Sequence, residues 1–143
     1  MKIQTLKRLI MLSVLSLLAT VSVHAQAGKQ FTVTIPFDFS VAGKAMTAGQ
    51  YLVGRATAEG LVIRRTDGNG SAFVMTRVVK DQPGETRLVF RRYEDQYFLG
   101  EVWISGASVG RELPLSRRER STAQEVAKHG APLQKTSVLA EKR

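Results

Sequence analysis

The chain has 143 residues, of which 21 are Lys or Arg and 12 are Asp or Glu, so its formal net charge is +9. This length allows one domain, and a hydrophobic content of 43% argues against a disordered chain. The chain contains no cysteine, which excludes a disulfide framework, a cysteine nucleophile and a zinc site built on cysteine.

Residues 1–25 have the pattern of a secretory signal peptide. A positive start with Lys2, Lys7 and Arg8 precedes an apolar stretch, and Val23-His24-Ala25 provides small or short side chains at a cleavage site. The apolar stretch is shorter than the about 20 residues that a membrane span needs. We therefore expect cleavage after this site, a secreted or periplasmic mature chain, and no membrane span after signal cleavage.

The segment 26–113 is predicted to form an all-β domain. Polar and apolar residues alternate over Gln30–Ile35, as is typical of a strand with one buried face, and Asp67–Gly70 has the residues of a tight turn. Comparable segments follow one another without an intervening helical pattern. The seven expected strands cover residues 30–35, 37–41, 51–57, 61–65, 72–79, 87–93 and 96–105. Because short connections join antiparallel neighbours, we expect an antiparallel meander closed as a sandwich or small barrel.

The C-terminal part of the chain is predicted to contain one helix. Ser116 and Glu119 have the spacing of a capping box, in which both side chains satisfy backbone N–H groups at a helix start. We place a C-terminal α-helix within residues 114–130, with Gly130 at its end. Residues 131–143 show no apolar periodicity and are predicted to form a loose tail.

Several segments of the chain resemble those of a known protein family. These segments are Ile35–Phe39, Ala48–Tyr51, Leu88–Tyr93, Tyr97–Trp103, Gly110–Pro114, Ser116 and Glu119-Arg120. They are similar to a family of small, exported, functionally uncharacterised proteins of acidobacterial-type soil bacteria, in which Gly is usual where this chain has Glu94. The resemblance implies export and an all-β body, and it implies no activity, substrate or catalytic residue.

Catalytic chemistry has little support in the sequence. His129 is the one histidine that follows the predicted signal peptide, and its place near the helix end does not favour a positioned base of a Ser-His-Asp triad. Asp38, Asp95 and Glu101 leave a carboxylate-based hydrolase as a less favoured alternative. We expect no enzyme activity, no cofactor and no metal site.

Three basic residues, Arg117, Arg118 and Arg120, cluster on the first turns of the predicted helix, where the helix dipole favours acidic residues. A residue choice that opposes local stability can have a functional reason. The cluster is therefore a candidate binding site for an anionic polymer such as lipopolysaccharide or an acidic polysaccharide, with a plain solvated surface as the alternative. No aromatic residue interleaves with it, so we expect no nucleic acid as partner.

A two-residue turn at Glu94-Asp95 would place Leu88 opposite Glu101, on the most apolar face in the chain. A buried carboxylate needs a partner. The candidate partners are Arg92, Arg77, Arg65 and Arg55. Each of them ends or interrupts a run of alternate residues that is expected to face the core. We predict a buried charge cluster of Glu101 with at least one of these arginines. The alternative is a β-bulge, which would shift the register by one residue and put Glu101 in solvent.

Together these observations favour an exported, non-enzymatic binding module, or an envelope-associated structural module, with an unknown envelope or extracellular partner. A small β-barrel that carries a hydrophobic ligand is the alternative. Its lining would come from the aromatic residues Phe31, Phe73, Phe90, Tyr97 and Trp103, which a packed core would use equally.

Overall fold

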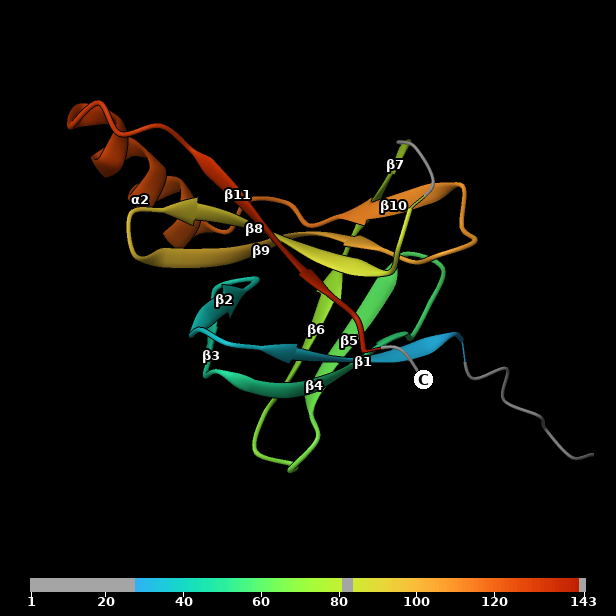
Figure 1. The fold of residues 1–143 in the computed structure, drawn as a ribbon. Coiled ribbons are helices and arrows are strands. Elements are labelled where there is room, and N and C mark those ends of the chain that lie inside the picture. Colours follow the sequence, from blue (N-terminus) through green and yellow to red (C-terminus); the bar gives the residue numbers. More distant parts are fainter. Residues whose placement is uncertain (1–27, 81–83, 142–143) are drawn as a thin grey trace, which may run out of the picture.

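The computed structural model describes residues 28–80 and 84–141, so the predicted signal peptide lies outside the described residues. The described part is mostly β, with eleven strands in two sheets and a single helix (Figure 1). The elements are β1 (Gln30–Ile35), β2 (Phe39–Val41), β3 (Lys44–Met46), β4 (Gly49–Arg55), β5 (Gly60–Arg65), β6 (Ser71–Met75), β7 (Arg77–Lys80), β8 (Arg87–Tyr93), β9 (Gln96–Trp103), β10 (Val109–Glu112), α2 (Arg117–Lys128) and β11 (Gln134–Leu139). Among these elements no helix has the length and apolar character needed to cross a membrane.

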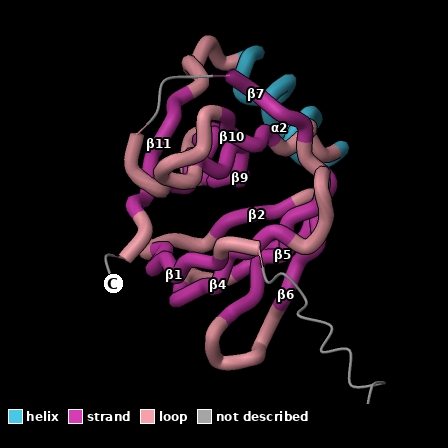
Figure 2. Tube along the Cα trace, turned by 90° about the vertical axis from the view of Figure 1, so that its right-hand side faces the viewer, coloured by secondary structure: helices cyan, strands magenta, loops and turns pink. Residues whose placement is uncertain are grey.

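The strands form two layers that face each other in Figure 2. Sheet 1 has four antiparallel strands in the order β1-β4-β5-β6. Sheet 2 has the order β11-β8-β9-β10-β7, and the short β2–β3 pair joins it beside β9. The contact between β2 and β9 is parallel, at Ser40 and Phe98, so sheet 2 is mixed. The expected seven-stranded, wholly antiparallel meander is therefore wrong in strand number and in this one contact, and no closed barrel forms within the described residues.

The segment 72–79, expected as one strand, is divided at Thr76 into β6 of sheet 1 and β7 of sheet 2. The backbone N–H and the hydroxyl of Thr76 both donate to the carbonyl of Glu59, at 2.7 and 2.8 Å. These two bonds hold a corner at which one strand leaves its sheet and the next enters the other. A pattern of alternating residues does not reveal such a corner, because the alternation continues through it.

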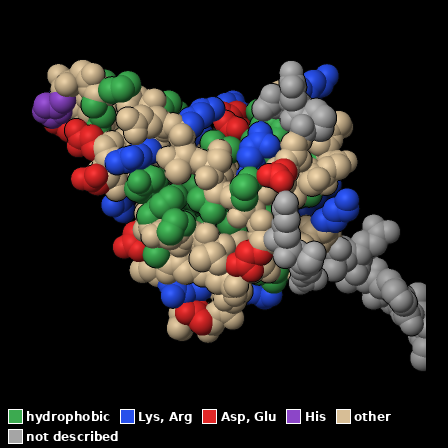
Figure 3. All heavy atoms as spheres, viewed as in Figure 1, with side chains coloured by type: hydrophobic (Ala, Val, Ile, Leu, Met, Phe, Trp, Pro, Cys, Tyr) green, Lys and Arg blue, Asp and Glu red, His purple; other side chains and the backbone are tan. Residues whose placement is uncertain are grey.

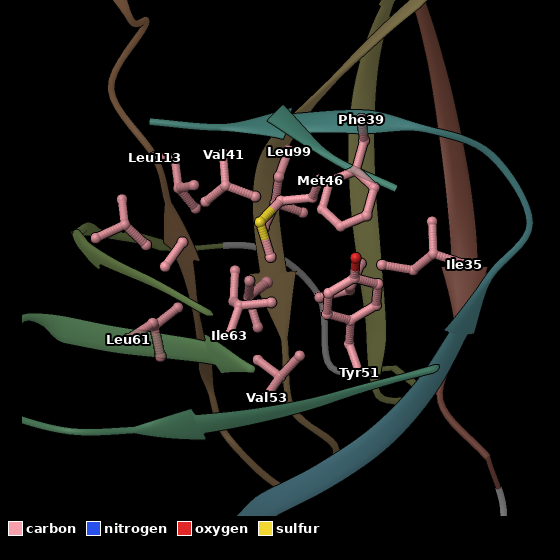
Figure 4. Close-up of a cluster of buried hydrophobic side chains, with 14 of the residues drawn as sticks. Ile35, Phe39, Val41, Met46, Tyr51, Val53, Leu61, Ile63, Leu99 and Leu113 are labelled. Atoms are coloured by element: carbon pink, nitrogen blue, oxygen red, sulfur yellow. The ribbon is translucent and has the colours of Figure 1, made fainter. Parts of the chain in front are cut away.

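The core lies between the two sheets and is made by alternate residues of their facing strands (Figure 4). Tyr51, Val53 and Ile63 of sheet 1 point toward Phe39 and Leu99 of sheet 2, and each of them is at most 4% exposed. The hydroxyl of Tyr51 donates to the carbonyl of Thr47, which satisfies its one polar group. The period-two alternation of the sequence therefore predicts the inward faces of these strands correctly.

The predicted loose tail is wrong, because Gln134–Leu139 forms β11 and pairs with Arg87–Arg92 of β8. Beyond β11, the N–H of Glu141 donates to the carbonyl of Thr32 in sheet 1. Its carboxylate accepts from Thr34 and Gln50 of the same sheet, which lowers its pKa. The C-terminal segment thus connects both sheets. The apolar pattern of β11 is too weak to predict a strand, and its backbone pairing with β8 is what makes this segment ordered.

A β-bulge changes the register in the β8–β9 hairpin. The predicted pair Phe90–Leu99 and the turn at Glu94 are present, and Glu94 has φ +53°, in the region that favours glycine. Beyond Leu99 the ladder skips Gly100, so Leu88 faces Val102 in place of Glu101. Val102 consequently takes the core position, and Glu101 moves to the outer face of sheet 2.

Candidate anion-binding site

Helix α2 begins where the sequence predicts it. The Oγ of Ser116 accepts the N–H of Glu119 at 3.1 Å, which confirms one half of the expected capping box. The other half is not formed, because the Glu119 side chain is 3% exposed and points into the protein. Its partner there is Arg91 of β8.

Arg91 and Glu119 form a bidentate ion pair between sheet 2 and the helix. Arg91 Nε lies 2.5 Å from Glu119 Oε1 and Arg91 Nη2 lies 3.1 Å from Oε2, while Nη2 also donates to the carbonyl of Leu113. The Arg91 side chain is 10% exposed. Burial and the nearby Glu119 carboxylate raise the pKa of Tyr93, whose hydroxyl donates to Glu119 at 3.3 Å. The first turns of α2 are therefore fixed against the outer face of β8.

This inward anchor determines where the neighbouring arginines lie. Because Glu119 points inward, Arg117, Arg118 and Arg120 stand on the exposed side of the helix. Their guanidinium groups form no ion pair or hydrogen bond with any part of 28–80 or 84–141. We call these three residues the arginine surface. The structure brings them together as predicted from the sequence.

Two shallow hollows adjoin the arginine surface and share Arg118. The larger, of about 670 Å³, lies between the β2–β3 turn and the helix start, and both Arg117 and Arg118 line it. Its remaining lining is small or apolar and comprises Ala42, Gly43, Pro114, Leu115, Ser116 and Ser121. The smaller, of about 310 Å³, is lined by Arg118 together with Asp38, Asp95 and Tyr97 among others. Arg118 is therefore the residue that the two hollows have in common.

The ring of Tyr97, which lines the smaller hollow, already has two partners. The ring of Phe37 stacks on it with centroids 3.9 Å apart, and the guanidinium of Arg92 lies 5.4 Å from its centroid. Base stacking needs an open aromatic face. The Tyr97 ring therefore gives no support to the binding of planar bases at this hollow.

The predicted charge cluster around Glu101 is not assembled. The skipped Gly100 turns Glu101 to the outer face, where Lys135 Nζ and Trp103 Nε1 donate to its two oxygens at 2.8 and 2.9 Å. Each of the four expected arginines bonds to a group other than Glu101. Arg55 donates to the carbonyls of Thr57 and Ala58, and Arg92 to the carbonyl of Glu94. Arg65 pairs with the carboxylate of Asp67, and Arg77 pairs with that of Glu112 on the neighbouring strand. The buried arginine–carboxylate pair that does exist, Arg91–Glu119, was not predicted.

The environment of Glu101 favours its charged form. Partial burial alone would raise its pKa, but the hydrogen bonds from Lys135 and Trp103 outweigh this effect and leave the pKa below its ordinary value. Lys135 belongs to β11, so this ion pair joins the C-terminal strand to the centre of sheet 2.

Of the three carboxylates considered for hydrolysis, Glu101 lies apart from the other two. Glu101 lies in the network with Lys135, whereas Asp38 and Asp95 line the smaller hollow. Asp38 accepts the backbone N–H of Ala48, which makes it part of the bend after Pro36, and the Asp95 side chain is fully exposed. A general acid is ordinarily held in a desolvated pocket, a position that neither residue occupies here.

On the face drawn in Figure 3, which includes α2, basic and acidic side chains are interspersed. No family model, curated protein or solved structure matches this chain. The arguments on function therefore rest on the residues and their arrangement.

Proposed function

We propose that this protein is an exported, non-enzymatic binding module that holds an acidic polysaccharide on its arginine surface. The observation that carries the proposal is the set of three unpartnered guanidinium groups on a helix whose first turns are fixed by a buried ion pair. Guanidinium groups bind carboxylates and sulfates with paired hydrogen bonds. A fixed helix loses little conformational freedom when such a ligand binds.

A polymer fits this arrangement better than a small ion. Single exposed charge pairs contribute about 0–1 kcal/mol, so useful affinity needs several of them acting together. The larger hollow, which is lined by Arg117 and Arg118 and by no acidic residue, is the place for such a chain, whereas Asp38 and Asp95 in the smaller hollow would repel it. We include three further points in this proposal. The chain is exported, it belongs to the family of exported proteins that it resembles, and its two facing sheets form a β-sandwich.

The alternative function, a small β-barrel that carries a hydrophobic ligand, is less well supported. The largest side chains between the sheets, Tyr51 and Phe90, are at most 1% exposed and fill the space that an enclosed ligand would need. A hollow of about 560 Å³ near Phe31 and Leu139 lies at one end of the sheets, but Glu85 and Glu141 are among its lining residues.

The proposal is tested by binding to polygalacturonate at several salt concentrations. The combined substitution of Arg117, Arg118 and Arg120 by Gln should weaken binding by about tenfold or more and reduce its salt dependence, since each lost contact removes about one unit of the slope. The matched control replaces Lys29, Arg64 and Lys80 by Gln. These three residues are exposed and lie away from α2, and they carry the same total charge.

Three results would contradict the proposal. Equal loss in the control would mean that the protein responds to net charge alone. An unchanged affinity of the arginine variant would show that the surface does not bind the polymer. Equal or stronger binding of duplex DNA would show that the polymer class is wrong.

A further inference from the structure

The larger hollow beside the arginine surface combines positive charge with apolar walls. Arg117 and Arg118 supply its charge, whereas Ala42, Pro114 and Leu115 supply apolar surface. Leu115 is a large apolar side chain that is 45% exposed. A bare polyuronate carries carboxylates and hydroxyl groups, so it would leave these apolar walls in contact with water. The two arginines therefore explain only part of the chemistry of this hollow.

Ala42 lines the hollow from a tight turn, in a conformation that is unusual for alanine. Val41 pairs with Lys44, so Ala42 and Gly43 alone connect β2 to β3. Their φ angles are +49° and +86°, as in a type I′ turn, in which Asn or Gly is the favoured first residue. An alanine here costs conformational energy that a glycine would avoid. Strain of this kind is characteristic of binding sites, and the methyl group is what alanine adds to the hollow.

Both walls of the hollow are held in place by the fold. On one side β2 and β3 pair with each other, and β2 also contacts β9 of sheet 2. On the other side Ser116 caps α2, and the Arg91–Glu119 pair holds the first turns of the helix. The walls come close at Gly43, where a Cβ atom would lie 3.9 Å from the Cβ of Ser116. A pre-formed hollow loses little conformational freedom on binding.

We propose that the larger hollow selects acidic polysaccharides that carry acetyl esters, with a carboxylate at the arginines and an acetyl methyl group against Ala42 and Leu115. This inference rests on the proposed function and names the class of polysaccharide that the arginine surface holds. An acetyl ester leaves the carboxylates charged and adds one methyl group and one carbonyl. In the helix cap the Ser116 hydroxyl acts as acceptor, so its proton can be donated to that carbonyl.

The two features of this ligand are needed together. A neutral acetylated chain would give Arg117 and Arg118 no anionic partner. A lipid with a long acyl chain needs an enclosed apolar site, whereas this hollow is shallow, and Leu115 is the one large aliphatic side chain among its described lining residues. An acidic chain with small acyl groups therefore matches the charge and the apolar surface that the hollow offers.

Binding to a matched pair of polymers tests the proposal. One polymer is O-acetylated polygalacturonate, and the other is the same preparation after mild alkaline deacetylation, which keeps its carboxylates. The unmodified protein should bind the acetylated polymer at least about fourfold more tightly, the change expected when one methyl group is covered. Equal affinity for both polymers would overturn this proposal and leave the proposed function standing. Binding of neither polymer would overturn both.

Leu115→Ser tests the apolar wall directly. It should abolish the preference for the acetylated polymer, while affinity for the deacetylated polymer stays within about twofold because Arg117 and Arg118 are retained. Leu133→Ser is the matched control. Leu133 is 50% exposed and lies beyond the other end of α2, so this change should leave the preference unaltered. An equal loss of preference in the control would overturn the proposal.

Ala42→Gly separates recognition from folding, because it removes the methyl group and relieves the backbone strain at the same time. The variant should unfold at the same or a higher temperature than the unmodified protein, and yet lose most of its preference for the acetylated polymer. A preference that survives unchanged in Ala42→Gly or in Leu115→Ser would overturn the placement of the acetyl group and with it the proposal.

Discussion

At the scale of single residues, Arg91 and Glu119 form the most deeply buried ion pair of the described residues. Both side chains lie almost entirely out of water, and each satisfies the other through two hydrogen bonds. Removing one member of such a pair leaves a buried charge without compensation, whereas replacing both with apolar residues removes the desolvation cost as well. The pair therefore determines where α2 docks more than it adds net stability.

Glu119→Ala should lower the free energy of unfolding by about 3–5 kcal/mol, because Arg91 is left buried and unpaired. Glu125→Ala is the control on the same helix. Its partner is the exposed Lys128, and the change should cost no more than about 0.5 kcal/mol. Denaturant unfolding measures both. Similar costs for the two variants would show that Glu119 is not held in a desolvated site.

A second prediction concerns Glu101 and the stability of the protein at acidic pH. Because its pKa is lowered in the folded protein, its contribution to stability is complete above the ordinary glutamate pKa of 4.5. The contribution is lost as the pH falls through the lower, folded value. Glu101→Gln should therefore reduce stability near neutral pH and make the loss of stability below pH 4.5 less steep.

The comparison for this second prediction is Lys135→Gln, which removes the same ion pair from the other side and should change the pH profile in the same way. Parallel pH profiles for Glu101→Gln and the unmodified protein would contradict the lowered pKa. Unfolding midpoints measured at a series of pH values separate these outcomes.

Single residues also show why part of the site could be predicted from the sequence. Ser116 was predictable because helix capping is a local interaction between neighbours in the chain. The pairing of Arg91 with Glu119 was not, because it joins positions 28 residues apart. The skipped Gly100 also reversed the faces expected for Glu101, and a bulge leaves no mark in an alternating pattern. Arg117, Arg118 and Arg120 are neighbours on one helix, so their grouping followed from the sequence.

At the scale of elements, β11 shows how a weak sequence pattern becomes an ordered strand. Two of its side chains, Thr136 and Val138, are half-buried. Most of its stabilisation comes from backbone pairing with β8 and from contacts made beyond it by Glu141. Strands of this kind escape prediction because sequence patterns report side-chain burial and not the presence of a free neighbouring edge.

Ending the chain after Leu133 should lower the free energy of unfolding by more than about 2 kcal/mol, the scale of a core deletion. The truncation exposes the edge of β8 and removes the partner of Glu101. Ser137→Ala, which alters an exposed side chain of the same strand, should change the midpoint little. A truncated chain as stable as the intact one would mean that β11 contributes nothing to the fold.

At the scale of the whole molecule, the two sheets are connected at several separate places. The chain crosses between them after β1, after β3 and at Thr76, and the segment after β11 reaches back from sheet 2 to sheet 1 through Glu141. The core side chains of each sheet are also buried against the other. Neither sheet can expose its inner face without exposing that of its neighbour, so the two are expected to unfold together.

This expectation can be checked with the single tryptophan of the chain, Trp103, which lies in sheet 2, alongside a backbone signal from both sheets. Tryptophan fluorescence and far-ultraviolet circular dichroism should give one coincident denaturant transition. Thr76→Val keeps the shape of the corner side chain but removes its hydroxyl bond to Glu59, at a cost of about 1 kcal/mol. Both signals should shift by the same amount with an unchanged slope, because the corner belongs to both sheets. A shift in the backbone signal alone, with the Trp103 transition in place, would show that sheet 2 is stable without sheet 1 and that the sheets are independent units.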